Sequence, residues 1–256
     1  MVDIHSHLIW GIDDGSESKE MTINMLKQAK EGGTKKLVLT PHYLLGYYEV
    51  PIIKVKEKAK EISLLAKYNE IDIEIYCGQE VYFNRKILEN FENKIIGTIN
   101  ESRYMLIEFN MRNFSVEEVI EILYELQLKG IVPIIAHPER YIKFIKSPSL
   151  INEFIKEGFL FQLNIGSLTG DFGKEVKKTA KIFLKNKIYS FFGSDAHRDK
   201  RRNPNMKLGV EALKAIDNNY FNYLKESGEK LLNNDEIKFI GNTIKEKKGL
   251  LDIFKK

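Results

Sequence analysis

The feature that most constrains the fold is a series of short apolar runs, each ending in a polar or metal-binding type of residue. Seven such runs occur, and they end near positions 5, 42, 80, 108, 137, 164 and 195. Successive ends are 27 to 38 residues apart, the size of one strand–helix unit. Alternating strands and helices favour a parallel sheet. A ring of polar strand ends favours closure into a barrel, because an open sheet would gather them at one switch point.

Apolar periodicity and capping residues place the individual elements. We expect helices over residues 18–31, 52–68, 115–129 and 205–216. We expect strands over residues 1–4, 36–40, 71–76, 104–107, 131–136, 160–163 and 188–193. No repeat, low-complexity block or linker divides the chain. We therefore predict one domain over residues 1–256, with a C-terminal helical extension from about residue 217.

The histidines carry the strongest chemical signal. His5 and His7 share one side of a strand, so both imidazoles can point at one metal ion. All five histidines of the chain fall at predicted strand ends, and four carboxylates join them. The nine predicted metal ligands are His5, His7, Asp14, His42, Glu80, Glu108, His137, Asp195 and His197. Nine nitrogen and oxygen ligands exceed the need of one tetrahedral ion and suit two or three, of manganese, iron or zinc.

Composition excludes several classes of protein. The single cysteine, Cys77, rules out an internal disulfide framework and a cysteine-rich metal site. With 40 basic and 36 acidic residues, the surface is mixed, and we expect no nucleic-acid partner. No apolar run approaches the ~18 residues of a transmembrane span. The histidine motif begins at residue 3 and leaves no room for a signal peptide, so we expect a cytoplasmic location.

The segments at these strand ends resemble the motifs of a known family. They are Asp3–His7, Gly11–Gly15, Thr40–Tyr43, Gly78–Tyr82, Tyr104–Phe109, Ala136–Tyr141, Asn164–Gly170 and Gly193–His197. Together they are similar to the polymerase-and-histidinol-phosphatase (PHP) superfamily, and more narrowly to its bacterial CpsB/YwqE-type tyrosine-protein phosphatases. The resemblance covers about residues 1 to 210. It implies an α/β fold, a distorted (β/α)7 TIM-like barrel, with a trinuclear, usually manganese, centre; iron, zinc and cobalt are alternatives.

The resemblance also implies roles within the centre. His5 and His7 would hold one ion, and Glu80 would bridge to a second ion bound also by Glu108 and His137. A third ion would lie near Asp14, His42 and His197, with Asp195 completing the cluster. Asp13 matches the family pattern too, although an Asp-Gly turn needs such a residue in any case.

Two arginines are expected to bind phosphate, since a guanidinium group fits phosphate oxygens bidentately. Arg140 follows His137 on the same rim, and Arg202 resembles the second phosphate-binding arginine of the family. The match at Arg202 is imperfect, so Arg198 and Arg201 remain alternatives. The residues assigned to catalysis are Arg140, Arg202, Asp195 and His42.

The function implied is a metal-dependent protein-tyrosine phosphatase. Its expected partner is a tyrosine-phosphorylated protein, a bacterial tyrosine autokinase that controls capsular or exopolysaccharide synthesis. A cysteine-dependent mechanism needs Cys-x5-Arg, but Phe83 stands six residues after Cys77. The alternatives are a PHP phosphoesterase acting on a small molecule such as histidinol phosphate, and a non-catalytic, metal-bound docking module. A homo-oligomer is also compatible with the sequence.

Aromatic and basic residues near the site and at the C-terminus are open to two interpretations. Tyr43, Tyr47, Tyr48 and Tyr141 can stack on a phosphotyrosine ring or fold inward. The basic tail, residues 245–256, can touch an anionic membrane surface or pack as a terminal helix.

Overall fold

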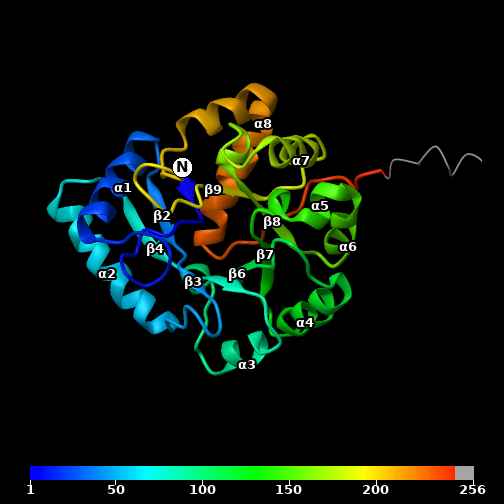
Figure 1. Ribbon diagram of the computed structural model, residues 1–256, viewed down its shortest axis with the longest axis horizontal. Coiled ribbons are helices and arrows are strands. Elements are labelled where there is room, and N and C mark those ends of the chain that lie inside the picture. Colours follow the sequence, from blue (N-terminus) through cyan, green and yellow to red (C-terminus); the bar gives the residue numbers. More distant parts are fainter. Residues whose placement is uncertain (246–256) are drawn as a thin grey trace, which may run out of the picture.

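The strands of the protein form a curled parallel sheet. The computed structural model describes residues 1–245, and Figure 1 shows the helices surrounding the strands. The strands within this range are β1 (Val2–Asp3), β2 (Lys36–Leu39), β3 (His42–Tyr43), β4 (Glu74–Cys77), β5 (Glu80–Tyr82), β6 (Tyr104–Glu108), β7 (Val132–Ile135), β8 (Leu160–Asn164) and β9 (Phe191–Gly193). They pair in parallel in the orders β1-β2-β4 and β3-β5-β6-β7-β8-β9.

Two of the seven predicted strand positions are each divided into two short strands. Pro41, which has no amide hydrogen to donate, separates β2 from β3, and Gly78 with Gln79 separates β4 from β5. The Gln79 side chain leaves the sheet, donating to Val50 O and accepting from Gly97 N. β4 also starts three residues later than predicted, because Ile71 to Ile73 lie outside the ladder. The interruptions distort the barrel without changing the strand order.

The barrel closes between its first and last strands. Ser6 forms a parallel bridge with Ala196. His7 N donates to Ala196 O at 2.9 Å, and Asp195 N donates to His5 O at 2.8 Å. These bonds make the seam of the barrel and confirm the predicted distorted (β/α)7 arrangement.

The helices cover the outside of the barrel (Figure 1). In residues 1–245 they are α1 (Lys19–Glu31), α2 (Ile52–Tyr68), α3 (Ile87–Glu92), α4 (Val116–Leu128), α5 (Ile142–Lys146), α6 (Ile151–Lys156), α7 (Lys174–Lys185) and α8 (Lys207–Leu232). Ser18 and Ser115 cap α1 and α4 as their sequences predict. None of these helices has both the length and the apolar character of a membrane span.

The helix predicted over residues 205–216 and the helical extension expected from about residue 217 together form α8. The two parts meet at a kink at Asp217, where φ is −157° and ψ is 98°, and the second part ends at Leu232. The Asp217 carboxylate accepts from Tyr220 N at 2.9 Å and so caps the second half of α8. The basic tail beyond residue 245 lies outside the described residues.

Alternation along each strand separates the barrel interior from the layer beneath the helices. In β6, Tyr104 and Leu106 belong to the inner cluster, whereas Met105 and Ile107 pack in the outer core. Glu108 follows Leu106 by two residues and therefore projects to the inner side at the carboxyl end of β6. The same geometry directs polar side chains over the end of the barrel.

Candidate metal centre

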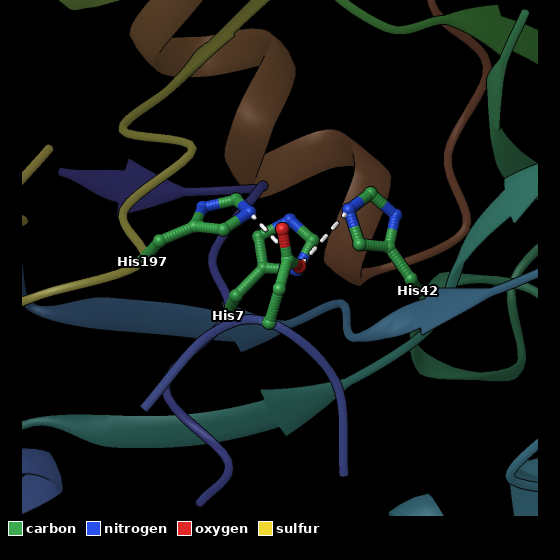
Figure 2. Close-up of side chains that lie close together, drawn as sticks. His7, His42 and His197 are labelled. Atoms are coloured by element: carbon green, nitrogen blue, oxygen red, sulfur yellow. Dashed lines mark ion pairs between the residues drawn. The ribbon is translucent and has the colours of Figure 1, made fainter. Parts of the chain in front are cut away.

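The structure brings all nine predicted ligands together at the carboxyl ends of the strands. Their ligand atoms form overlapping groups, each lying within 4.8 Å: His7 with Asp14, His42 and His197; His5 with His7, Glu80 and Asp195; and His42 with Glu80 and Glu108. Figure 2 shows the imidazole rings of His7, His42 and His197 gathered around a shared space. The ninth residue, His137, places Nε2 3.0 Å from Glu80 Oε1 and 3.7 Å from Glu108 Oε1.

Glu80 is at the centre of the cluster. Its Oε2 atom lies 3.2 Å from His5 Nε2, 3.3 Å from His7 Nε2 and 3.0 Å from His42 Nδ1. Its other oxygen faces His137. This fully buried carboxylate thus contacts imidazoles through both of its oxygens, as the predicted bridging role requires.

The hydrogen bonds behind His5 and His7 direct their lone pairs into this space. His5 Nδ1 donates to Gln162 Oε1 at 3.0 Å, and His7 Nδ1 donates to Asp13 Oδ2 at 2.8 Å. In the neutral rings, the two Nε2 atoms, 3.1 Å apart, then both carry lone pairs. Two lone pairs this close repel each other unless a cation lies between the nitrogens.

A buried polar atom without a hydrogen bond also indicates that the site binds cations. Among the described residues, Glu80 Oε2 is buried and, although three imidazole nitrogens lie 3.0 to 3.3 Å away, none of them makes a well-oriented hydrogen bond with it. A native protein seldom leaves such an atom unsatisfied. The residues present therefore fit bound divalent cations, and the donor set of imidazole nitrogen and carboxylate oxygen excludes a thiolate-type site.

Burial and neighbouring charges shift the pKa values of two histidines and one carboxylate of the cluster. Burial and the nearby His7 lower the pKa of His197 to about 4, and burial with the Arg140 charge lowers the pKa of His137 to about 4. Both imidazoles are thus neutral at pH 7, as metal ligands must be. Burial and the Glu80 carboxylate raise the pKa of Glu108 to about 8. The negative charges of Glu80 and Glu108 would repel each other, and a bound cation would reduce this repulsion.

Three residues of the site have left-handed backbone. The φ angles are 31° at His137, 51° at Asp195 and 50° at Arg202. Residues with side chains rarely adopt this conformation, and where they do they concentrate at functional sites. The conformation occurs just after strand ends at His137 and Asp195, and in the loop that follows β9 at Arg202.

The two predicted phosphate-binding arginines meet at Asp195. Arg140 Nη1 lies 2.7 Å from Asp195 Oδ2, and Arg202 Nη2 lies 2.6 Å from the same oxygen. Burial alone would raise the pKa of Asp195, but His5, Arg202 and Arg140 hold it well below the usual range. Arg198 instead binds the carbonyls of Asp14 and Gly15. Arg202 is therefore the arginine placed beside Arg140.

Phe172 lies beneath both guanidinium groups, a contact that the sequence analysis missed. The Cζ atoms of Arg140 and Arg202 are 4.6 Å and 5.7 Å from the centre of its ring. Nothing in the local sequence marks Phe172, because the loop before α7 meets the arginines only in the folded chain.

Three other supporting residues were missed or left undecided. Gln162 holds His5, and Asn164 Nδ2 donates to Asp195 Oδ2 at 2.6 Å. Asp13 accepts from His7 Nδ1 and also from His42 N at 3.0 Å, so it orients ligands as well as shaping the turn. Gln162 and Asn164 are polar residues in an otherwise apolar strand, and this is the sequence feature that could have identified them.

The tyrosines near the site divide into two pairs. Tyr43 and Tyr141 are buried in the core, so the inward-folding alternative holds for both. Tyr47 is 81% exposed, and Tyr48 stacks on the His42 ring with a centroid separation of 6.1 Å. Only the second pair can meet a ligand from solvent.

Comparisons with known proteins agree with this geometry. Residues 1–233 match the family described as "Capsular polysaccharide synthesis, CpsB/CapC". CapC of Staphylococcus aureus is 37% identical over 239 residues, 93% of each chain. The tyrosine-protein phosphatase YwqE of Bacillus subtilis is 31% identical over 238 residues, again 93% of each. A crystal structure reported for YwqE from Bacillus subtilis and CpsB from Streptococcus pneumoniae, described as unique metal-dependent tyrosine phosphatases, superposes with a TM-score of 0.91 at 29% identity, covering 96% of this chain and 100% of that chain.

Proposed function

The chain belongs to the capsular polysaccharide synthesis family CpsB/CapC, and from that premise we propose that it is a metal-dependent tyrosine-protein phosphatase. The observation that carries this is the nine-residue ligand cluster joined to an arginine pair at Asp195. As a phosphoric monoester hydrolase, it would act on a phosphotyrosine protein, and we infer a tyrosine kinase of the capsule or exopolysaccharide system as the substrate.

The proposed ligands are the nine residues predicted from the sequence. When bound, divalent ions supply positive charge and lower the pKa of water at the site. We infer manganese as the native metal, because imidazole with carboxylate and no thiolate suits it, although zinc, iron or cobalt could bind the same donors. His5 and His7 hold their lone pairs toward the ions through Gln162 and Asp13.

The arginines would orient the phosphoryl group. Arg140 and Arg202 are 20% and 32% exposed, so their guanidinium groups reach the rim while Asp195 and Phe172 fix them from below. Two preorganised guanidinium groups stabilise the equatorial oxygens as the phosphoryl group transfers. The tyrosyl leaving group needs little protonation, since phenol has a pKa of about 10.

The test is hydrolysis by purified protein with manganese added. We expect turnover of a phosphotyrosine peptide, and much slower release of phosphate from a phosphoserine peptide and from histidinol phosphate. Selective hydrolysis of histidinol phosphate would replace the proposed substrate, and bound metal without any turnover would favour a docking module. Glu80→Ala should abolish activity and reduce bound metal, because Glu80 contacts four imidazoles.

A further inference from the structure

Helix α7 presents a row of lysines to solvent. Each of the five lysines Lys174, Lys177, Lys178, Lys181 and Lys185 lies three or four residues from another of them, so they share one face of the helix. Together with Ile182 they line a shallow hollow. The opposite face is the buried one, formed by Thr179, Ala180, Phe183 and Leu184. We call the five lysines the α7 lysine face.

The positive charge of this face is poorly neutralised. The one acidic residue of α7, Glu175, lies 3.8 Å from Lys178. Within residues 1–245, the other four lysines of the face have no ion-pair partner within 4 Å. The whole chain is nearly balanced, with 40 basic and 36 acidic residues, so composition alone does not account for the row. Neighbouring like charges on a helix are unfavourable, and an anionic partner would relieve them.

The lysine face continues into the proposed active site. Lys177 Nζ lies 3.4 Å from Thr169 O. Thr169 and Phe172 line a cavity of about 660 Å³ whose other lining residues include Lys200, Arg201 and Arg202. Asp171 is the single acidic residue of that lining. Basic groups therefore extend from the arginine pair, through the cavity, to α7.

We propose that this cavity and the α7 lysine face bind an acidic segment that flanks the phosphotyrosine of the substrate. The inference rests on the proposed function and adds the chemical class of the substrate sequence. From Lys174 to Lys185 the helix rises about 17 Å, the length of about five residues of extended peptide. Electrostatic complementarity of this kind selects partners and speeds their association.

A flanking peptide fits the observations better than a membrane surface. A helix that lies on a membrane needs an exposed apolar face, whereas the apolar face of α7 is buried. In addition, the basic groups start at the arginines that would hold the phosphate. A surface that binds a membrane would not need to lie next to these arginines.

The experiment compares two phosphotyrosine peptides, one with glutamates around the tyrosine and one with glutamines at the same positions. Both are hydrolysed by the manganese-loaded full chain and by a Lys181→Glu/Lys185→Glu variant. The matched control is Lys60→Glu/Lys67→Glu, which reverses two exposed charges on α2, on the opposite side of the barrel in Figure 1. Hydrolysis of p-nitrophenyl phosphate, which has no flanking segment, measures the basal activity of each variant.

We expect the wild-type chain to prefer the glutamate peptide, with a preference that falls as salt is added. The α7 variant should lose about five- to tenfold in kcat/KM for that peptide. It should keep wild-type hydrolysis of the glutamine peptide and of p-nitrophenyl phosphate, and the α2 variant should behave as wild type.

Equal hydrolysis of the two peptides by the wild-type chain would overturn the inference and leave the proposed function standing. Hydrolysis of neither peptide would remove both. Sedimentation with vesicles containing phosphatidylserine tests whether the α7 lysine face binds a membrane surface. Binding that the α7 variant loses, without any peptide preference in the wild type, would assign the lysine face to a membrane instead.

Discussion

Replacing Phe172 by leucine should weaken phosphate binding without removing the metal. The Phe172 ring supports Arg140 and Arg202 at 4.6 Å and 5.7 Å, and the two arginines are 20% and 32% exposed. A cation–π contact is worth about 0.5–1 kcal/mol at exposed sites. Because the arginines are only partly buried, two contacts sum to about 1–2 kcal/mol, which corresponds to about 5- to 30-fold in affinity.

The assay is competitive inhibition by inorganic phosphate, with p-nitrophenyl phosphate as substrate. For Phe172→Leu, the inhibition constant and KM should both rise by about 5- to 30-fold, with a smaller change in kcat. Phe172→Tyr is the matched control, because it keeps the ring and should restore most of the affinity. Metal content and Tm should match the wild type in both variants.

Two results would refute the reasoning. An unchanged inhibition constant in Phe172→Leu would show that Asp195 alone positions the arginines, through its contacts at 2.7 Å and 2.6 Å. Loss of metal or a large drop in Tm would show that Phe172 supports the fold of the loop before α7. The tyrosine variant separates the two results, since only a positioning role predicts rescue by the ring.

Three further outcomes follow from the contacts at the site. Arg140→Ala should raise KM and leave metal content unchanged; loss of metal would mean that Arg140 holds the ligand Asp195 in place. Asp13→Ala should weaken metal affinity by about 10- to 100-fold, because it removes the partner of His7 Nδ1; an unchanged metal titration would contradict this. Manganese at about 100 times its Kd should stabilise the chelated protein by about 2.7 kcal/mol and raise Tm by about 5–10 °C. A Tm that does not respond to the ion in differential scanning calorimetry would mean that the cluster does not bind it in the folded state.

Local patterns were enough to predict the barrel and to gather the candidate ligands. Each strand leaves a residue such as Glu108 or His137 at its carboxyl end, and parallel strands bring those ends to one face. The order of the strands follows from the alternation of strand and helix, so residues as distant as His5 and His197 could be assigned to the same cluster before their contacts were known.

What the sequence did not predict depends on contacts between distant segments. Phe172 acquires its role only when the loop before α7 folds under arginines that follow β7 and β9. The predicted helix and its predicted extension meet at Asp217, but the sequence did not show that the chain kinks there or that Tyr220, Phe221 and Leu224 beyond the kink are buried. Neither feature can be predicted from local periodicity, because tertiary packing decides which side chains of a segment are covered.

Asp195 connects the closing of the barrel, the ligand cluster and the arginine pair. Its amide donates to His5 O, one of the two backbone hydrogen bonds that cross the seam. Its Oδ1 atom lies 3.5 Å from both His5 Nε2 and His7 Nε2, while Oδ2 binds Arg140 and Arg202. A chain with an open seam would lose the contacts between Asp195 and the two histidines, and its ligand set would be incomplete. A metal ion bound by His5, His7 and Asp195 should therefore stabilise the seam, because its ligands come from both sides of the junction.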